Sequence, residues 1–273
     1  MIDFKTAADY VRARLDRGTL TPEDVAKLTA AFQEHAGLAV DGMPGDKTLA
    51  ILNAPAPIAM PPRTQPPRLV DRRAFAAQAH GPKREWKVYG RPWSKVTGVC
   101  LHQTACVLGE RDERWDSVGA HVGITASGKI EWLHGFDRVV AAANGFNAQT
   151  VSIEVDGRFE GVEGDPSTLW DDPSTPVREA ATTFTPAQVA AVKDAVRWIV
   201  AEVAAHGGQV KVLVAHRQSS GQRRSDPGSA IWRRAALPLI AELGLHDGGH
   251  GFKIDDGYPI PEAWDPSRVG IRY

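Results

Sequence analysis

A proline-rich stretch divides this chain of 273 residues into two parts of unequal length. Six prolines lie close together, at positions 55, 57, 61, 62, 66 and 67. Such a composition favours extended polyproline conformations, which act as semi-rigid spacers between folded parts. The sequence therefore predicts a first domain over residues 1–53, a linker over 54–68, a main domain over 69–245 and a tail over 246–273.

The first domain has the pattern of a small helical domain. Thr21 can cap a helix that begins with Pro22, and acidic residues follow in its first turn. Apolar residues then recur at the spacing of one helix face, namely Val25, Leu28 and Phe32. A turn over residues 40–45 and a short helix over 48–52 are expected to complete the domain.

The main domain alternates strand patterns with helix patterns. The strand candidates are residues 96–101, 121–125, 130–133, 151–155 and 210–214. A capping box at Thr185 begins a helix that stops at Gly207, and a second helix is expected over 230–243. This order predicts an α/β fold with a mixed central sheet flanked by helices. Residues 69–94 are expected to pack against this domain, whereas 158–183 and 246–273 show no clear pattern.

Composition excludes several classes of partner. The net charge of −1 gives no general attraction to nucleic acid or to an anionic membrane. No apolar run approaches the ~20 residues that span a bilayer, so membrane insertion is not expected. The first residues also lack the pattern of a secretory signal. Five arginines crowd residues 217–234, as either a solvated basic face or a site for an acidic substrate.

Three residues far apart in the sequence could share a metal ion. His102 and His216 each end an apolar run, and Asp226 follows His216 by ten residues. Two neutral imidazoles and one carboxylate give zinc three protein ligands, and the fourth position stays open for a water whose pKa falls from ~16 toward ~7. This arrangement is typical of a hydrolase. Cys100 shares a strand face with His102 and is a rival ligand, although a thiol in an apolar strand more often packs in the core.

Four blocks in this order carry a family resemblance. They are LHQTA at 101–105, GAHVGIT at 119–125, VSIEVDG at 151–157, and AHR at 215–217 with RSDPG at 224–228. Residues 96–243 thereby resemble the zinc-dependent N-acetylmuramoyl-L-alanine amidases of the peptidoglycan-recognition and phage-lysozyme type. The first domain resembles the small helical peptidoglycan-binding module of wall hydrolases. A helical cap without a ligand is the alternative.

The resemblance implies roles for single residues. One zinc ion per chain would be held by His102, His216 and Asp226. Glu154 lies in an apolar strand, where it matches the glutamate that some relatives aim at the zinc-bound water as a general base; a solvent-facing edge glutamate is the alternative. Arg224 stands where many relatives have lysine and could stabilise the oxyanion. Gln103 and Asn144 would line the substrate groove.

The expected function is hydrolysis of the amide bond between N-acetylmuramic acid and L-alanine in peptidoglycan, by a monomer. Without a signal, the protein would be made in the cytoplasm and would reach the wall through a holin-like partner, as an endolysin does, or through a dedicated export system, as a bacteriolytic toxin does. The alternative from another class is a protein that binds peptidoglycan without cutting it.

Overall fold

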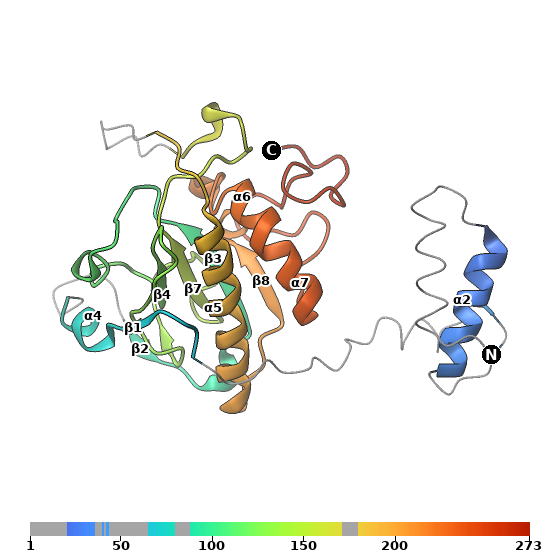
Figure 1. The fold of residues 1–273 in the computed structure, drawn as a ribbon, viewed down its shortest axis with the longest axis horizontal. Coiled ribbons are helices and arrows are strands. Elements are labelled where there is room, and N and C mark those ends of the chain that lie inside the picture. The colour runs from blue at the N-terminus through green and yellow to red at the C-terminus, as the bar shows by residue number, and fades with distance from the viewer. Residues whose placement is uncertain (1–20, 36–39, 41, 44–64, 80–87, 171–179) are drawn as a thin grey trace. The chain divides into compact units, whose positions relative to one another are not determined.

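A computed structural model gives the fold of this chain (Figure 1) and describes residues 21–35, 40, 42, 43, 65–79, 88–170 and 180–273. The chain divides into two compact units, residues 1–58 and 59–273. The expected helix at 48–52, most of the first domain and most of the linker lie outside the described residues. The bounds of the four proposed segments remain predictions.

The described part of the first unit is one capped helix with three later residues, Val40, Gly42 and Met43. Helix α2 spans Pro22–His35, and the Oγ1 of Thr21 accepts a hydrogen bond from the backbone N–H of Asp24 at 3.3 Å. Gln33 connects the helix to these residues, because its amide accepts from Gly42 N at 3.0 Å and donates to Met43 O at 2.9 Å.

A mixed sheet forms the centre of the second unit, as the sequence predicts. Within the described residues its order is β1-β5-β4-β7-β3-β8. The strands are β1 Leu69–Asp71, β3 Gly98–Gln103, β4 Val122–Ile124, β5 Ile130–Trp132, β7 Thr150–Val155 and β8 Val212–Ala215. Strands β4 and β5 are antiparallel and the other neighbouring pairs are parallel. A separate two-stranded sheet pairs β2 Tyr89–Gly90 with β6 Arg138–Val139.

Helix α5, Pro186–Ala205, covers one face of this sheet (Figure 1). Its apolar side chains pack with alternate residues of β3 and β7, among them Val99, Leu101 and Ile153. The intervening residues of β3, Cys100 and His102, point to the opposite face, because successive side chains of a strand alternate. The sheet therefore has one face that builds the core and one that is available for a site.

The last helical segment runs without a break from Ser229 to Leu243, close to the predicted 230–243. It consists of α6 Ser229–Ile231, a π-helical turn Trp232–Ala236 and α7 Leu237–Leu243. Pro238 has no backbone N–H to bond one turn back, and a π turn is one way in which a helix accommodates that loss. Gly244 ends the segment with a left-handed φ of 60°.

Several short elements have too weak a pattern to be predicted. Within residues 69–94, β1 joins the edge of the main sheet and α4 forms over Arg73–Ala79. Short 3-10 helices span Trp93–Lys95, Asp112–Arg114, Pro166–Thr168, His216–Ser219 and Gly221–Arg223. Elements of three to seven residues offer too short a stretch for a periodicity to be read.

The tail over residues 246–273 has no regular helix or strand, yet it belongs to the core of the second unit. Trp264 and Ile260 are buried in the same apolar cluster as the face of α5. Arg268 pairs with Asp247 at 2.7 Å and with Asp265 at 3.0 Å. Among the described helices, none is long and apolar enough to cross a bilayer.

The N-cap of α5 provides a test of the fold. The Oγ1 of Thr185 accepts from Gln188 N at 3.1 Å, and the Gln188 side chain accepts from Thr185 N at 3.0 Å. We expect Thr185→Ala to lower the free energy of unfolding by about 1–2 kcal/mol, because it removes the hydroxyl that accepts a hydrogen bond from the first turn of the helix. Thr185→Ser keeps the hydroxyl, so its free energy of unfolding should stay near that of the parent protein. Urea denaturation followed by circular dichroism measures both, and equal midpoints for all three proteins would contradict the expectation.

Candidate metal centre

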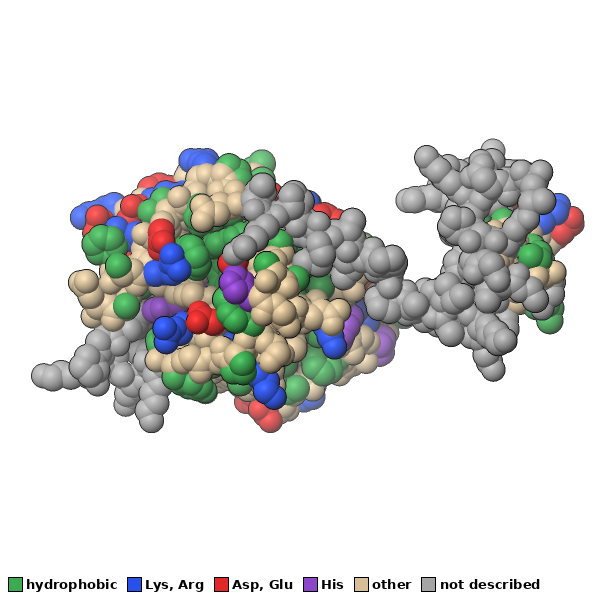
Figure 2. Space-filling view, turned by 90° about the horizontal axis from the view of Figure 1, so that it is seen from below, with side chains coloured by type: hydrophobic (Ala, Val, Ile, Leu, Met, Phe, Trp, Pro, Cys, Tyr) green, Lys and Arg blue, Asp and Glu red, His purple; other side chains and the backbone are tan. Residues whose placement is uncertain are grey.

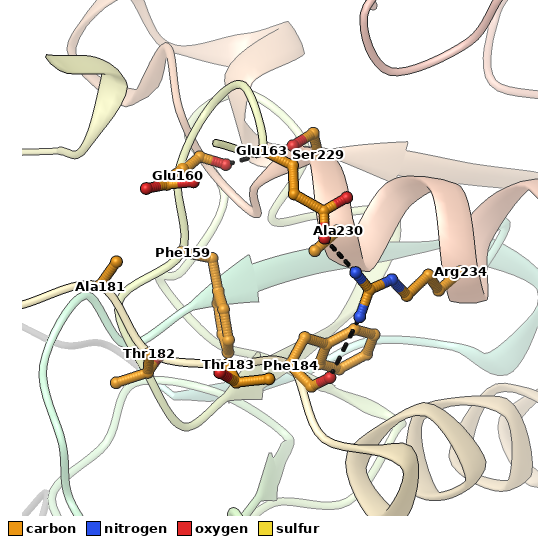
Figure 3. Close-up of a pocket in the computed structure, with 10 residues that line it drawn as sticks. All are labelled: Phe159, Glu160, Glu163, Ala181, Thr182, Thr183, Phe184, Ser229, Ala230 and Arg234. Carbon is orange, nitrogen blue, oxygen red and sulfur yellow. Dashed lines mark hydrogen bonds and ion pairs between the residues drawn. The ribbon is translucent and has the colours of Figure 1, made fainter. Parts of the chain in front are cut away.

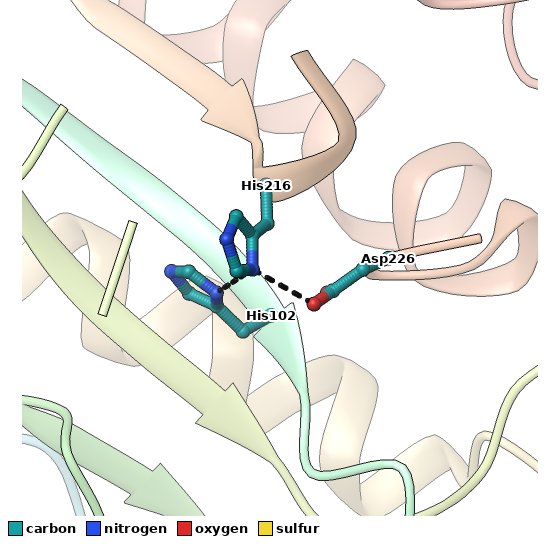
Figure 4. A group of neighbouring side chains, drawn as sticks. All are labelled: His102, His216 and Asp226. Atoms are coloured by element: carbon teal, nitrogen blue, oxygen red, sulfur yellow. Dashed lines mark hydrogen bonds and ion pairs between the residues drawn. The ribbon is translucent and has the colours of Figure 1, made fainter. Parts of the chain in front are cut away.

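Two neighbouring parallel strands bring the two histidines together. Leu101 of β3 is in register with Ala215, the last residue of β8, so His102 within β3 and His216 directly after β8 lie at the same end of these two strands. Asp226 reaches them from the loop that follows (Figure 4). All three side chains are buried. The pairing of β3 with β8, together with the loop after β8, thus brings residues that are distant in the sequence into one cluster.

The distances within this cluster suit a shared cation. His216 Nδ1 lies 3.0 Å from His102 Nδ1 and 3.0 Å from Asp226 Oδ2. One potential ligand atom from each residue can be chosen so that all three lie within 4.8 Å of one another. Ligands on a tetrahedral zinc ion, at ~2.0–2.2 Å from the metal, are separated by distances of this order.

Protons alone do not satisfy these contacts. A neutral imidazole nitrogen carries at most one proton. If His216 Nδ1 is protonated, it can donate well either to His102 or to Asp226, but not to both. If His102 Nδ1 is protonated instead, the lone pair of His216 faces the Asp226 carboxylate. A cation between the three atoms removes this conflict, because each of them then presents a lone pair to it. The residues therefore fit a metal ion.

Burial keeps His102 in the form that a metal needs. Desolvation, together with the nearby charges of His216, Arg223 and His121, lowers the pKa of His102 well below its ordinary value. The imidazole is therefore neutral at physiological pH, and a neutral ring has a lone pair to donate. His121 is not part of the cluster: its Nδ1 accepts from Ser152 N at 2.9 Å, and its Nε2 lies 2.9 Å from Arg138 O.

Neighbouring groups orient the ligands. The Nε2 of His216 lies 3.4 Å from Asn144 Oδ1, which favours a proton on Nε2 and leaves Nδ1 free. The second carboxylate oxygen of Asp226, Oδ1, accepts from Gln103 N at 3.0 Å. Asp226 thus uses one oxygen for the backbone of β3 and turns the other to His216.

Glu154 stands beside the cluster on the next strand. His102 and Glu154 are partners in the register of β3 and β7, and His102 Nδ1 is 3.9 Å from Glu154 Oε1. Burial raises the pKa of Glu154 well above its ordinary value, with a further rise from Asp226 and an opposing effect of Arg223. The Oε2 atom is buried and has no hydrogen-bond partner among the described residues. This carboxyl group is therefore free to bond to a water or a ligand.

The side chain of Gln103 points away from the cluster. Its amide accepts from Phe159 N at 2.6 Å and donates to Phe159 O at 3.1 Å and to Ser225 O at 2.8 Å. The residue is also buried. A contact with substrate would break these bonds, so the Gln103 side chain connects β3 to Phe159 and Ser225. Its expected place in the substrate groove remains a prediction.

The two adjacent arginines of the ligand loop have different surroundings. The guanidinium of Arg224 is exposed and lies over the rings of Tyr273 at 4.7 Å and Tyr258 at 5.4 Å. Arg223 is half-buried over Trp170 at 4.3 Å, and it is the arginine whose charge acts on His102 and Glu154. Sequence reasoning singled out Arg224 alone, because the blocks carry no information on which side chain turns inward.

Two further features bear on the sequence expectations. Cys100 is not in the metal-ligand cluster; it packs with Ala143 and Val214. A cavity of about 260 Å³ opens elsewhere, between residues 159–163, residues 181–184 and the start of the last helical segment (Figure 3). None of the three candidate ligands lines it. On the face seen in Figure 2, histidine and acidic side chains lie among basic ones.

Comparisons with known proteins identify the family of this chain. The family model described as N-acetylmuramoyl-L-alanine amidase matches residues 92–229, half of the chain. An endolysin amidase from Clostridium intestinale is similar in structure, with 16% identity, a TM-score of 0.42, and coverage of 66% of this chain and 97% of that chain. For human PGRP-IBETAC in complex with glycosamyl muramyl pentapeptide these values are 15%, 0.42, 67% and 99%. No curated protein matches the sequence.

The cluster predicts metal-dependent stability. Because a ligand that binds only the folded state stabilises it, zinc at 1,000 times its Kd should add about 4 kcal/mol to the free energy of unfolding. His102→Ala should abolish this gain. His206→Ala is the matched control, since His206 stacks on Trp93 outside the cluster and should leave the gain intact. Thermal unfolding with and without zinc measures the effect; an equal gain in the His102 variant would exclude the site.

Proposed function

This chain belongs to the N-acetylmuramoyl-L-alanine amidase family, and on that premise we propose that it is a zinc-dependent hydrolase of peptidoglycan. The bond cut is the amide between N-acetylmuramic acid and L-alanine. One observation carries the proposal: His102, His216 and Asp226 converge without protein protons that could satisfy all their contacts. The family description identifies the amide bond that is cut, and the cluster could hold the metal ion that the hydrolysis requires.

The three ligands are proposed to hold one zinc ion through the Nδ1 atoms of His102 and His216 and through Asp226 Oδ2. Zinc in such a site supplies a Lewis acid that polarises a carbonyl group and makes water more acidic. Three protein ligands leave one position open for a substrate or water. The backbone N–H of Gln103 and the amide of Asn144 keep the ligands oriented.

Glu154 is proposed as the general base. Its carboxyl group lies beside His102, and one of its oxygens has no hydrogen-bond partner among the described residues. It can take a proton from the attacking water and return that proton to the nitrogen of the departing L-alanine residue. An arginine of the ligand loop is proposed to offset the negative charge that forms on the carbonyl oxygen: Arg224, as the sequence predicts, or Arg223, whose charge acts on His102 and Glu154.

The competing function is recognition of peptidoglycan without cleavage. A binding protein needs neither a third metal ligand nor a carboxyl group next to the metal. Both Asp226 and Glu154 are present here, in contact with the two histidines or close to them. This favours catalysis. The first unit is proposed to be a wall-binding module, and a holin-like partner or an export system to bring the protein to the wall.

The first test separates binding from catalysis at Glu154. Glu154→Gln keeps the shape of the side chain but removes the base, so we expect the rate to fall by about 100- to 10,000-fold while zinc binding is retained. Glu242→Gln is the control, because Glu242 of α7 forms an ion pair with Arg197 of α5 at the surface. Release of stem peptides from purified sacculi measures the rate. A fully active Glu154 variant would remove this assignment.

The second test identifies the bond. Mass spectrometry of digested sacculi should find intact stem peptides with a free L-alanine amine, together with glycan strands that carry free lactyl groups. A chelator should abolish the digestion, and added zinc should restore it. Release of reducing sugar would mean a glycosidase, and binding of sacculi without any product would mean a recognition protein.

A further inference from the structure

Arg217, the residue after His216, is a buried cation inside a cage of aromatic rings. Its side chain is 1% exposed. The guanidinium carbon lies 4.7 Å from the ring centre of Trp264, 5.0 Å from that of Tyr273 and 5.8 Å from that of Tyr258. All three rings come from the tail over residues 246–273. Nothing in the proposed reaction uses this arginine.

The same residue bridges both ends of the ligand loop. The backbone N–H of Arg217 donates to Asp226 O at 2.9 Å, and its Nη1 donates to Arg224 O at 2.6 Å. Its own carbonyl accepts from Tyr258 N at 2.7 Å. One residue therefore connects the strand end that carries His216, the loop that carries Asp226, and the tail.

The cage compensates for burying the charge. No acidic side chain forms an ion pair with Arg217 among residues 21–35, 65–79, 88–170 and 180–273, and its Nε has no hydrogen-bond partner there. Desolvation lowers the pKa of Arg217 to about 10, so the group is still charged at neutral pH. A desolvated guanidinium over aromatic faces is stabilised by cation–π attraction.

Tyr273 connects the cage to a third segment of the chain. Its hydroxyl donates to Thr168 O at 3.3 Å. Its ring lies so close to Gly161 that a Cβ built there would stand 1.8 Å from the tyrosine oxygen. The cage is therefore fixed from outside the tail as well, by residues 161–168.

We propose that Arg217 is a positioning residue of the metal centre, and that the tail holds it through the cage of Tyr258, Trp264 and Tyr273. Loss of the guanidinium would release Arg224 O, two residues before Asp226, from the strand end, and the 3.0 Å spacing of His216 Nδ1 and Asp226 Oδ2 would lose one of the contacts that fix the ligand loop. This inference rests on the proposed metal site.

The experiment compares zinc affinity in the full chain, by competition with a chromophoric chelator. Arg217→Met removes the charge and the hydrogen bond at similar volume, and we expect about 10- to 100-fold weaker zinc binding, the usual loss when a residue behind a metal ligand is removed. Arg217→Lys should lose affinity too, because an ammonium group cannot stack on the rings and donate to Arg224 O in the same geometry.

Arg91→Met is the matched control. Arg91 is also a buried arginine whose pKa burial lowers to about 10, and it donates to carbonyl groups, Phe136 O and Asn147 O, outside the loop of residues 216–226. It should lose stability without a comparable loss of zinc affinity. A purely structural role of Arg217 would make the two methionine variants alike in both measurements.

A second pair of variants tests the cage without altering Arg217. Tyr273→Phe keeps the ring and should bind zinc nearly as the parent does, whereas Tyr273→Leu removes the ring and should weaken binding. If Arg217→Met does not fold, the zinc affinities of the two Tyr273 variants test the positioning role instead. Parent protein that binds no zinc would refute the proposed function itself. Parent-like zinc affinity in the Arg217 variants, or in Tyr273→Leu where they do not fold, would refute the positioning role alone.

Discussion

The parallel pairing of β3 with β8 is the constraint on which the candidate site depends. It places His102 and His216 one residue beyond a matched pair, Leu101 and Ala215; His102 still lies within β3, and His216 begins a short 3-10 helix directly after β8. The pairing of β3 with β7 then puts Glu154 beside His102. Only Asp226 comes from a loop, and its carboxylate is fixed by a backbone N–H of β3. Ligands on regular elements are held more precisely than ligands on loops.

Sequence reasoning could reach the ligands because strand ends carry a local signal. An apolar run that stops at a histidine indicates a side chain at the edge of a sheet, and the four blocks in order indicate which edges meet. The alternation within residues 98–103 also separates a core face from a site face. The mixed sheet and the long capped helix α5 follow from the same patterns, and the structure agrees with them.

Other features had no local signal. The direction of the Gln103 side chain follows from alternation relative to His102, but its bonds to Phe159 and Ser225 involve residues 56 and 122 positions away. The aromatic residues of the tail are scattered without period, so nothing in their spacing indicates that they surround Arg217. Burial of a charged residue is a property of the folded chain, and arginine is seldom expected in a core. Long-range contacts of this kind are invisible to periodicity.

The alternation along β3 ties the core and the chemistry to the same strand. Leu101 packs under α5, and His102 faces the metal-ligand cluster from the adjacent position. A slip of one residue in the pairing would turn the imidazole into the apolar layer and leave the leucine among the polar groups. Misaligned chains would thus be both unstable and inactive, so selection against poor folding and selection for catalysis act on a single alignment.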